Sequence, residues 1–487
     1  NIEITFIRRI YKEKMTTNQT KTKGTSSDSE FLGKAPVGKL MWQLAIPAIT
    51  AQVINMLYNI VDRVYIGHIA EVGALALTGV GVCSPIIVLV SAFAAFVSMG
   101  GAPRASISMG RGDDKGAEQI LGSCFVFQIC VSVILTIILL LFNRPLLMAF
   151  GASDNTIGYA VSYMNIYAIG TIFVQLTLGM NAFVTAQGFA KLSMYTVLIG
   201  AICNIVLDPI FIFVLNMGVS GAALATILSQ AISCVWVLHI LTSGRSELKL
   251  KKEYFRFNWR MLAPCLALGL SPFIMQGSES ILNICFNSSL QRYGGDVAVG
   301  AMTILSTVMS FALMPLQGLA QGAQPITSYN FGAGKADRVK QSFKILVIAS
   351  FAYSLLLWAF VQFFPQIFVG LFTTSAELID FTVPALRIYT AALLIMGIQI
   401  ACQMTFVSIG NAKSSIIVAI MRKFIILIPL IYILPNFFAD KTFAVYLAEP
   451  IADTCAVIFT VVLFAFEFRK ALKKLREESA QTGIASR

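Results

Sequence analysis

Long apolar stretches recur along this chain from about residue 40 to residue 467. Each is close to or longer than the ~20 residues that cross a ~30 Å hydrocarbon core as a helix. The chain is 57% hydrophobic and only 12% charged, against roughly 25% charged residues in an ordinary soluble domain. Segments of about ten residues that alternate in polarity, the signature of a membrane β-barrel, are absent. The sequence therefore predicts an all-α integral membrane protein.

Twelve transmembrane helices are expected. The predicted spans are 40–66, 74–103, 117–142, 158–186, 191–214, 218–242, 261–289, 297–326, 341–371, 377–407, 413–436 and 441–467. A polar stretch, 243–260, separates the sixth span from the seventh and is interpreted as a linker between two six-helix halves.

Basic residues predict the orientation, because cationic loops are retained in the cytoplasm. They cluster in loops that would lie on one side: Lys34, Lys39, Arg104, Arg111, Lys115, Arg245, Lys249, Lys251, Lys252, Arg256, Arg260, Lys335, Arg338, Lys340, Lys344, Arg469, Lys470, Lys473, Lys474 and Arg476. Both termini are therefore expected in the cytoplasm. The net charge of +12 is read as a topology signal, and no nucleic-acid partner is expected.

The two halves resemble each other in sequence. Short motifs recur at similar spacing: Pro47 with Pro272, 72–74 with 299–301, Gly110-x-Gly112 with Gly332-x-Gly334, and Gly188-x-Ala190-Lys191 with Gly410-x-Ala412-Lys413. Because an even number of helices separates equivalent points, the halves form a parallel repeat. Transporters of this kind bind substrate between the halves and rock them for alternating access.

The expected domain organisation follows from these boundaries. Residues 1–36 are a disordered cytoplasmic tail, in which 1–14 are interpreted as non-native and Met15 as the natural start. No cleavable signal peptide is expected. The remaining units are an N-lobe (37–242), a cytoplasmic linker (243–260), a C-lobe (261–468) and a basic cytoplasmic tail (469–487).

Ionisable groups inside a bilayer are costly and need a reason. The first predicted helix ends in Tyr58-Asn59-Ile60-Val61-Asp62, and the fifth contains Asn204-Ile205-Val206-Leu207-Asp208-Pro209. Helical spacing places Asp62 with Tyr58, and Asp208 with Asn204, on one face of each helix. Pro209 cannot donate to the carbonyl of Ile205, which loosens the helix beside Asp208.

These carboxylates, with Asn181 and Thr226, predict an oxygen-rich cation site. Two acidic groups in a low-dielectric pocket favour uptake of a proton by one of them, and hard oxygen donors also suit a small metal cation. The coupling ion is thus H⁺ or Na⁺, with no other metal or cofactor expected. The alternative is structural: Asp62 caps its helix and Asp208 bonds a neighbouring one.

At these residues the chain resembles the multidrug and toxic compound extrusion (MATE) family, in its bacterial DinF-like branch. The resemblance extends from Lys39 to Phe468 and rests on Val61-Asp62-Arg63-Val64-Tyr65-Ile66-Gly67, Gly110-Arg111-Gly112-Asp113, Asn204 to Pro209, 221–226 and Tyr329-Asn330-Phe331-Gly332.

The resemblance implies two pseudo-symmetric six-helix bundles around a central cavity, and H⁺- or Na⁺-coupled antiport of amphipathic, often cationic compounds. It implies a cation site in the N-lobe at Asp62, Asn181, Asn204, Asp208 and Thr226, with Tyr58 accessory. Some family members use a glutamate in the seventh helix, and Glu279 lies one residue from the expected place. Equivalent C-lobe positions, such as Ile426 and Leu430, are apolar.

The second half carries its own charges at membrane depth: Arg387, Arg422, Lys423, Glu449 and Asp453. Glu449 and Asp453 share a helix face, and Lys423 lies too deep for easy snorkelling. We expect an internal ion pair or triad, which would serve as a gate, a substrate contact or structural neutralisation.

Other functions are less consistent with the sequence. The Gly332-Ala333-Gly334-Lys335 segment lacks the spacing of a phosphate-binding loop, and no HExxH, GxSxG or histidine pair is present, so no enzyme is expected. The rivals within transport are a lipid-linked-precursor flippase and an exporter of an endogenous metabolite. We expect a monomer in the inner membrane, with small amphipathic molecules and lipids as its partners.

Overall fold

The computed structural model describes residues 30–69, 72–244, 246–373 and 375–481. Within these ranges the chain is helical. The elements are α2 (Glu30–Lys34), α3 (Val37–Gly67), α4 (Gly73–Gly110), α5 (Asp114–Ala149), α6 (Ile157–Ala186), α7 (Ala190–Pro209), η1 (Ile210–Val214), α8 (Gly218–Thr242), η2 (Lys252–Tyr254), α9 (Trp259–Gly332), α10 (Ala336–Phe363), α11 (Pro365–Gly370), α12 (Ala376–Tyr389), α13 (Leu393–Ser408), α14 (Ala412–Ile420), η3 (Met421–Leu427), α15 (Ile428–Ile433), η4 (Leu434–Asn436) and α16 (Lys441–Gln481).

Twelve membrane spans follow from these helices over the described residues. Ten helices are long and apolar enough to cross a bilayer, and α12 with α13 forms an eleventh span bent by 46°. The 74-residue α9 holds two spans, because Gly295 at φ 64° and ψ −158° breaks it and an unbroken helix of that length would exceed 100 Å. The expected span 377–407 is therefore bent, at the three residues between α12 and α13.

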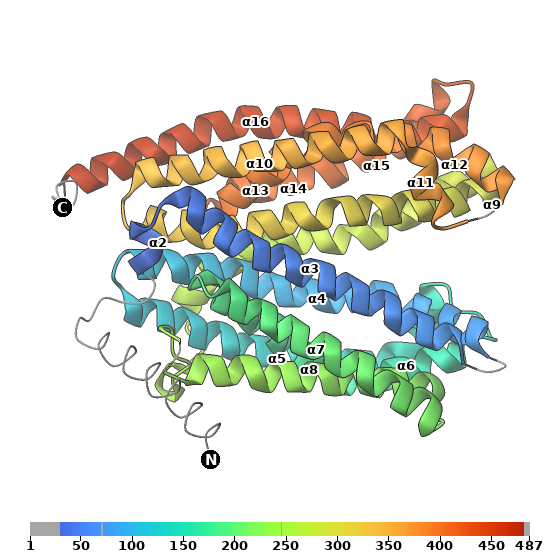
Figure 1. Ribbon diagram of the computed structural model, residues 1–487, viewed down its shortest axis with the longest axis horizontal. Coiled ribbons are helices and arrows are strands. Elements are labelled where there is room, and N and C mark those ends of the chain that lie inside the picture. Colours follow the sequence, from blue (N-terminus) through green and yellow to red (C-terminus); the bar gives the residue numbers. More distant parts are fainter. Residues whose placement is uncertain (1–29, 70–71, 245, 374, 482–487) are drawn as a thin grey trace, which may run out of the picture.

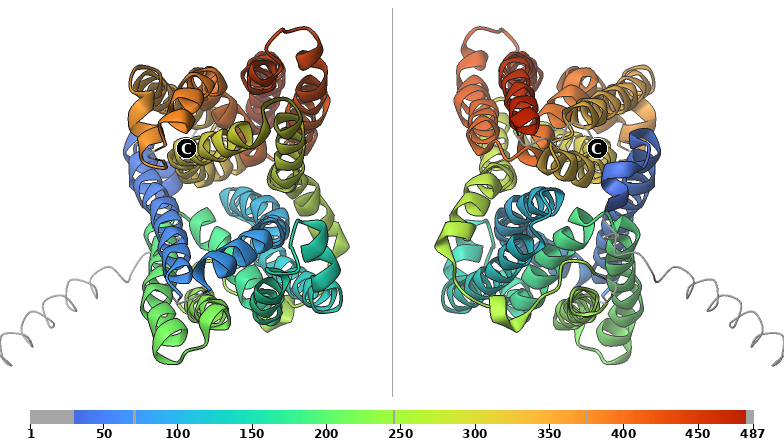
Figure 2. Two further views of the ribbon diagram at one scale, coloured as in Figure 1. Left: turned by 90° about the vertical axis from the view of Figure 1, so that its right-hand side faces the viewer. Right: turned by 90° about the vertical axis from the view of Figure 1, so that its left-hand side faces the viewer.

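Helices α3 to α8 form one bundle, the N-lobe, and α9 to α16 form the other, the C-lobe (Figures 1 and 2). Both α2 and the last turns of α16 lie at one end of the molecule, called here the terminal end; the opposite end is the distal end. In α3 the residues from Val37 to Ala48 include all but one of its buried side chains, and none is buried from Ile49 to Tyr65. The lobes are therefore in contact near the terminal end and diverge toward the distal end.

Glycines make the contact between the lobes. A Cβ on Gly100 of α4 would lie 1.8 Å from the carbonyl oxygen of Cys265 on α9, and a Cβ on Gly322 of α9 would lie 2.5 Å from Cα of Ala45 on α3. Small residues permit such close helix approach in membranes. The two lobes can pack this tightly only because no side chain stands between their backbones.

Two segments expected to lie outside the bundles are ordered against them. Residues 1–29 of the expected disordered tail lie outside the described residues, but the end of that tail is not disordered: α2 is helical and Leu32 is fully buried. The linker packs beneath the N-lobe, where Gln187 accepts hydrogen bonds from the amides of Glu247 and Leu248. Lys251 lies 2.6 Å from the carboxylate of Glu118, and this hydrogen bond raises the pKa of Lys251.

Candidate functional site

Asp62 and Asp208 meet in the distal half of the N-lobe. Asp62 lies five residues before the end of α3, and Asp208 is fully buried near the end of α7. The two carboxyl groups are close enough to interact with each other. Two bare carboxylates repel each other in a medium of low dielectric, so this proximity favours a proton or a metal cation between them.

Asn204 and Thr226 complete this group. The Asn204 amide donates to Asp208 at 3.2 Å and contacts the Thr226 hydroxyl at 3.5 Å. Three buried oxygens of this group have no hydrogen-bond partner: Asp62 Oδ1, Asn204 Oδ1 and Asp208 Oδ2. Buried polar atoms are seldom left in this state. Unpartnered oxygens of this kind would be satisfied by a proton or a small hard cation.

The local helix geometry explains how α7 presents Asp208. Pro209 ends the regular α-helix, and the next five residues, Ile210–Val214, form the π-helix η1. A proline has no amide hydrogen to complete the helical pattern, and π-helical turns are frequent at functional sites. The break predicted from Pro209 is thus present, immediately after the buried carboxylate.

Tyr163 is a member of this group that the sequence analysis missed. It is 3% exposed, lies near the start of α6 and interacts with Thr226 and Asp62. Tyr167, one turn later on α6, is equally buried and stacks on it, with ring centroids 6.3 Å apart. The signal available in the sequence was this pair of phenols four residues apart on one helix face.

Asn181 is separated from the group. It lies five residues before the end of α6, and its amide donates to the carbonyl of Ser193 at 3.3 Å. Tyr163 precedes Asn181 by eighteen residues on the same helix, a distance of about 27 Å along the axis. The structure therefore brings together Asp62, Asn204, Asp208 and Thr226, and places Asn181 toward the terminal end.

A small cavity of about 40 Å³ adjoins the group, with Tyr58, Asn204 and Thr226 in its wall. A cavity of this size has room for roughly one to three water molecules. The cavity lining continues along α7 and α8 through Thr196, Gly200, Ser229 and Ser233. It supplies a polar space beside Asn204 and Thr226, and α3 contributes Asn55 and Tyr58 to its wall.

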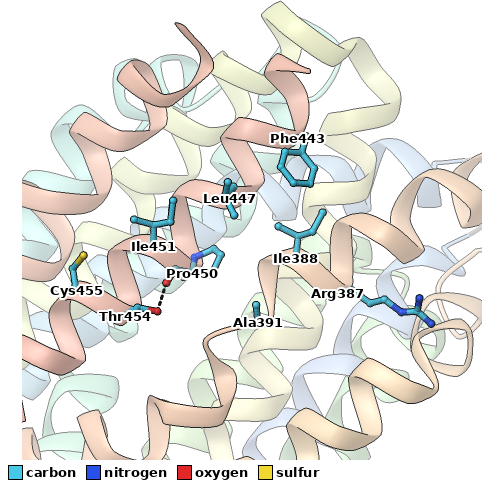
Figure 3. Close-up of a pocket in the computed structure, with 9 residues that line it drawn as sticks. All are labelled: Arg387, Ile388, Ala391, Phe443, Leu447, Pro450, Ile451, Thr454 and Cys455. Atoms are coloured by element: carbon cyan, nitrogen blue, oxygen red, sulfur yellow. Dashed lines mark hydrogen bonds between the residues drawn. The ribbon is translucent and has the colours of Figure 1, made fainter. Parts of the chain in front are cut away.

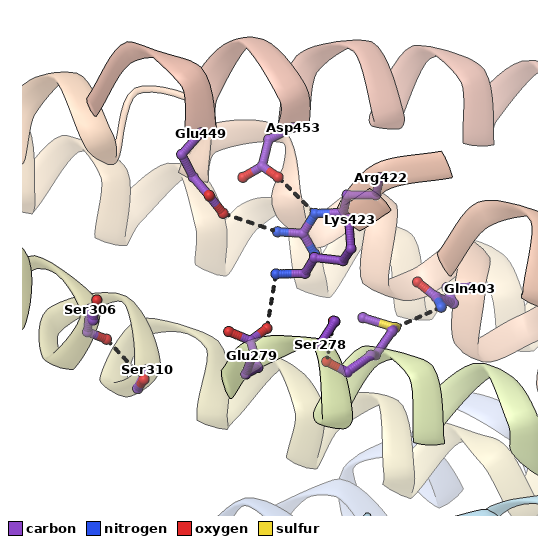
Figure 4. A network of polar contacts seen from close by, with 10 residues as sticks. Ser278, Glu279, Ser306, Ser310, Gln403, Arg422, Lys423, Glu449 and Asp453 are labelled. Atoms are coloured by element: carbon purple, nitrogen blue, oxygen red, sulfur yellow. Dashed lines mark hydrogen bonds and ion pairs between the residues drawn. The ribbon is translucent and has the colours of Figure 1, made fainter. Parts of the chain in front are cut away.

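The charges of the C-lobe form a second polar group, shown in Figure 4. Arg422 and Lys423 lie in the π-helix η3 between α14 and α15. Arg422 binds Asp453 at 2.7 Å and lies 3.8 Å from Glu449, both on α16. Lys423 binds Glu279 of α9 at 2.8 Å. The expected internal ion cluster is present, and it includes Glu279.

Arg387 is not part of that cluster. It is exposed, and its Nε donates to the carbonyl of Gln362 at 3.1 Å. It lies at the edge of a separate pocket of about 530 Å³ between α12 and α16, whose other walls are largely apolar (Figure 3). The structure thus divides the predicted C-lobe charges into a buried cluster and one peripheral arginine.

The chain matches a known protein family in both lobes. The family model described as MatE matches residues 47–210 and 273–433, one segment in each lobe, which agrees with the internal repeat. The multidrug export protein MepA of Staphylococcus haemolyticus (strain JCSC1435) is 23% identical over 449 residues, covering 91% of this chain and 97% of the relative. MepA of Staphylococcus aureus (strain NCTC 8325 / PS 47) is 23% identical over 438 residues, with 89% and 95% covered.

Solved structures share the fold. An outward-facing multidrug resistance MATE family transporter of the MOP superfamily superimposes with a TM-score of 0.86 at 23% identity, covering 92% of this chain and 99% of that one. A MOP superfamily transporter from Pyrococcus furiosus Vc1 (DSM3638), described as having a binding pocket of reversed polarity, gives 0.86 at 24% identity, with 93% and 100% covered. The expected all-helical membrane fold is confirmed.

Proposed function

Because this chain belongs to the MatE family of multidrug efflux transporters, we propose that it is an antiporter that exports amphipathic and cationic organic compounds in exchange for H⁺ or Na⁺. Members of this family are ion-coupled transporters and not enzymes. The DinF-like branch, suggested by the sequence resemblance, is part of the proposal.

The observation that carries the proposal is the group of unpartnered buried oxygens around Asp62 and Asp208. A cation bound there cancels charge that must otherwise be hydrated or paired. Since Asp208 precedes the π-helical break at η1, cation binding would let α3 and α7 repack and so change the wall that the N-lobe presents to the C-lobe. Export then follows from the reciprocal effect of cation and substrate on each other's affinity.

The predicted orientation supports export driven by an inward cation gradient. We propose that the terminal end is cytoplasmic and that the protein is an inner-membrane monomer with substrate access from the distal end in this conformation. The lobes are in contact at the terminal end and diverge distally, as in an outward-facing transporter. A membrane potential adds about 2.3 kcal/mol per charge per 100 mV to inward cation movement.

Two features argue against the flippase alternative. The described residues hold twelve spans without additional ones. The buried C-lobe cations also face carboxylates, since Arg422 and Lys423 contact Asp453 and Glu279 respectively. A cationic central pocket for a phosphorylated lipid is therefore not what these residues form.

Transport by purified protein in liposomes tests the function. The pH gradient and the Na⁺ gradient are imposed independently, and uptake of a fluorescent lipophilic cation is followed. We expect movement of the dye against its own gradient when one of the two ion gradients is present. Equal dye movement in protein-free liposomes under every gradient would reject antiport.

A further inference from the structure

The C-lobe cluster contains one more carboxylate than it has cations. Glu279, Glu449 and Asp453 face only Arg422 and Lys423. Two of the carboxylates have close partners, at 2.7 Å for Asp453 and 2.8 Å for Glu279. Glu449 is 5% exposed, and its contact with Arg422 at 3.8 Å is too long for a hydrogen bond. A buried carboxylate without a close partner is costly.

Glu279 differs from the rest of the cluster in its exposure. Its side chain is 54% exposed, against 5% for Lys423. On α9, Phe273 contacts Phe93 of the N-lobe, and Ser271 donates to Ser415 of the C-lobe. At about 100° per residue, Glu279 lies about 80° from Ser271 and about 120° from Phe273. It therefore occupies the edge of α9 between the face that packs on the C-lobe and the face directed at the N-lobe.

Lys423 interacts with both Glu279 and Glu449. It belongs to the π-helix η3 and carries its ammonium on a flexible four-carbon stem. It now binds Glu279, and it lies within electrostatic range of Glu449 (Figure 4). If a third cation bound Glu279, each carboxylate would have its own partner. Asp453 would pair with Arg422, Glu449 with Lys423, and Glu279 with the third cation.

We propose that Lys423 is a tethered competitor of the exported cation: it occupies Glu279 in the empty transporter and moves to Glu449 when a monocationic substrate binds Glu279. This rests on the proposed function, since it concerns which compounds the transporter binds. In the empty state Glu449 has only its long contact with Arg422, whereas after the swap each of the three carboxylates has its own cation. The swap also sets specificity, because a neutral compound would leave Glu279 without a cation after displacing Lys423, whereas an organic monocation replaces the lost charge.

Two double-mutant cycles on the full-length protein in detergent test this, with tetraphenylphosphonium as the probe and calorimetry as the readout. Lys423→Met removes the competitor, and we expect it to raise affinity about tenfold. The same change made in the Glu279→Gln protein should bring no gain, because the contested carboxylate is absent. Lys423→Gln replaces the Met variant if the latter is not monodisperse.

Glu449→Gln provides the second cycle. It removes the acceptor for Lys423 without altering Glu279, so we expect weaker probe binding by about tenfold in the otherwise native chain and no change in the Lys423→Met background. A purely structural role for Glu449 would weaken binding equally in both backgrounds and would overturn the proposal. The proposal would also be overturned if the Lys423→Met variant bound tetraphenylphosphonium no more tightly than the native chain. The same holds if neither protein bound the probe.

Failure of this proposal and failure of the proposed function are distinguishable. The liposome assay reports ion-coupled export whatever the partner of Lys423, and the binding cycles report competition whether or not an ion gradient drives transport. Export with flat binding cycles would reject only the competitor role.

Discussion

Unpartnered oxygens are the feature of the N-lobe site that matters at the scale of single residues. Asp208 is fully buried, yet Oδ2 has no hydrogen bond, and its other oxygen accepts from Asn204. Asp62 faces it from α3. Structural acids in membrane proteins are normally paired with cations or donors, so this arrangement supports the proposed exchangeable cation.

Replacing Asp62 or Asp208 by Asn tests the exchangeable charge. Asn keeps the shape of Asp but cannot alternate between charged and neutral forms, so we expect each variant to lose ion-driven efflux while expression and thermal stability stay close to native. Drug efflux from proteoliposomes is the measurement. Asp154→Asn, at an exposed acid in the α5–α6 loop, is the matched control. Native efflux rates in both site variants would leave only a structural role.

Asn204 lies in the observed site, whereas Asn181 belongs only to the site implied by the family resemblance. Asn204→Ala removes the amide that contacts Asp208 and Thr226, and should shift the H⁺ or Na⁺ concentration for half-maximal efflux by about tenfold. Asn181→Ala lies toward the terminal end and should leave that concentration unchanged. The ion dependence of transport decides, and a larger shift in Asn181→Ala than in Asn204→Ala would contradict the geometry described here.

At the scale of elements, the short helix α2 connects the lobes. Arg338 of α10 donates to the carbonyls of Leu32 and Ala35, and Asn330 donates to Leu32. On the other side, Phe31 lies so close to Gly188 of the N-lobe that a Cβ there would be 2.6 Å from its ring. The Tyr329-Asn330-Phe331-Gly332 motif thus holds α2 across the terminal end.

Arg338→Gln should release α2 from the C-lobe. Hydrogen bonds from a charged donor contribute about 1.5–3 kcal/mol each, so we expect a lower melting temperature and faster amide exchange at 30–36. Hydrogen–deuterium exchange read by mass spectrometry is the measurement. Arg476→Gln is the control, because Arg476 forms an exposed ion pair with Asp337 that should contribute only about 0–1 kcal/mol. Unchanged exchange at 30–36 would show that other contacts hold α2.

At the scale of the whole molecule, the contact between the lobes repeats itself. Gly110 of α4 lies against the carbonyl of Tyr329, while Gly332 of α9 lies against the carbonyl of Ile107. Gly110 and Gly332 are equivalent positions of the repeat, and so are Ile107 and Tyr329. Each lobe therefore presents the same glycine to the same place on the other, as expected for an interface with two-fold pseudo-symmetry.

Gly322→Val should weaken this contact. Its side chain would clash with the backbone of Leu44 and Ala45, and overpacking of this kind costs about 1–3 kcal/mol, so the lobes should separate at the terminal end. Crosslinking of Cys124 to Cys265, which are within side-chain reach across the interface, measures the separation. Gly277→Val, at a position with open space around it, is the control. Equal crosslinking in both variants would contradict the expected separation.

Orientation is tested on the intact molecule. A cysteine introduced at Glu253 in the linker should react with a membrane-impermeant maleimide only after cells are permeabilised, because the basic loops are expected to be cytoplasmic. A cysteine introduced at Asp154, in a loop at the distal end, should react in intact cells. The reverse pattern would mean that the terminal end faces outward.

Much of the fold was predictable from local pattern. The starts of the first six spans lie within three residues of the starts of helices α3 to α8, because the length of an apolar helix follows the thickness of the bilayer. Helices α4 and α5 extend seven residues beyond the predicted ends at 103 and 142. The bend between α12 and α13 was not predictable, since a continuous apolar run carries no mark of where a helix changes direction. The order of α2 was also missed, because its hydrogen bonds come from Asn330 and Arg338, far along the chain.

The helical membrane class, the repeat and the two carboxylates of the N-lobe could be predicted from the sequence, since these depend on hydropathy and on the high cost of burying charge. Which polar residues meet depends on the packing of the helices. In the structure Tyr163 interacts with Thr226, Asn181 lies outside the group around Asp208, and Glu279 forms an ion pair with Lys423. The reason is that helical periodicity assigns a residue to a face and a depth on its own helix, whereas contact between helices depends on their packing, crossing and breaks.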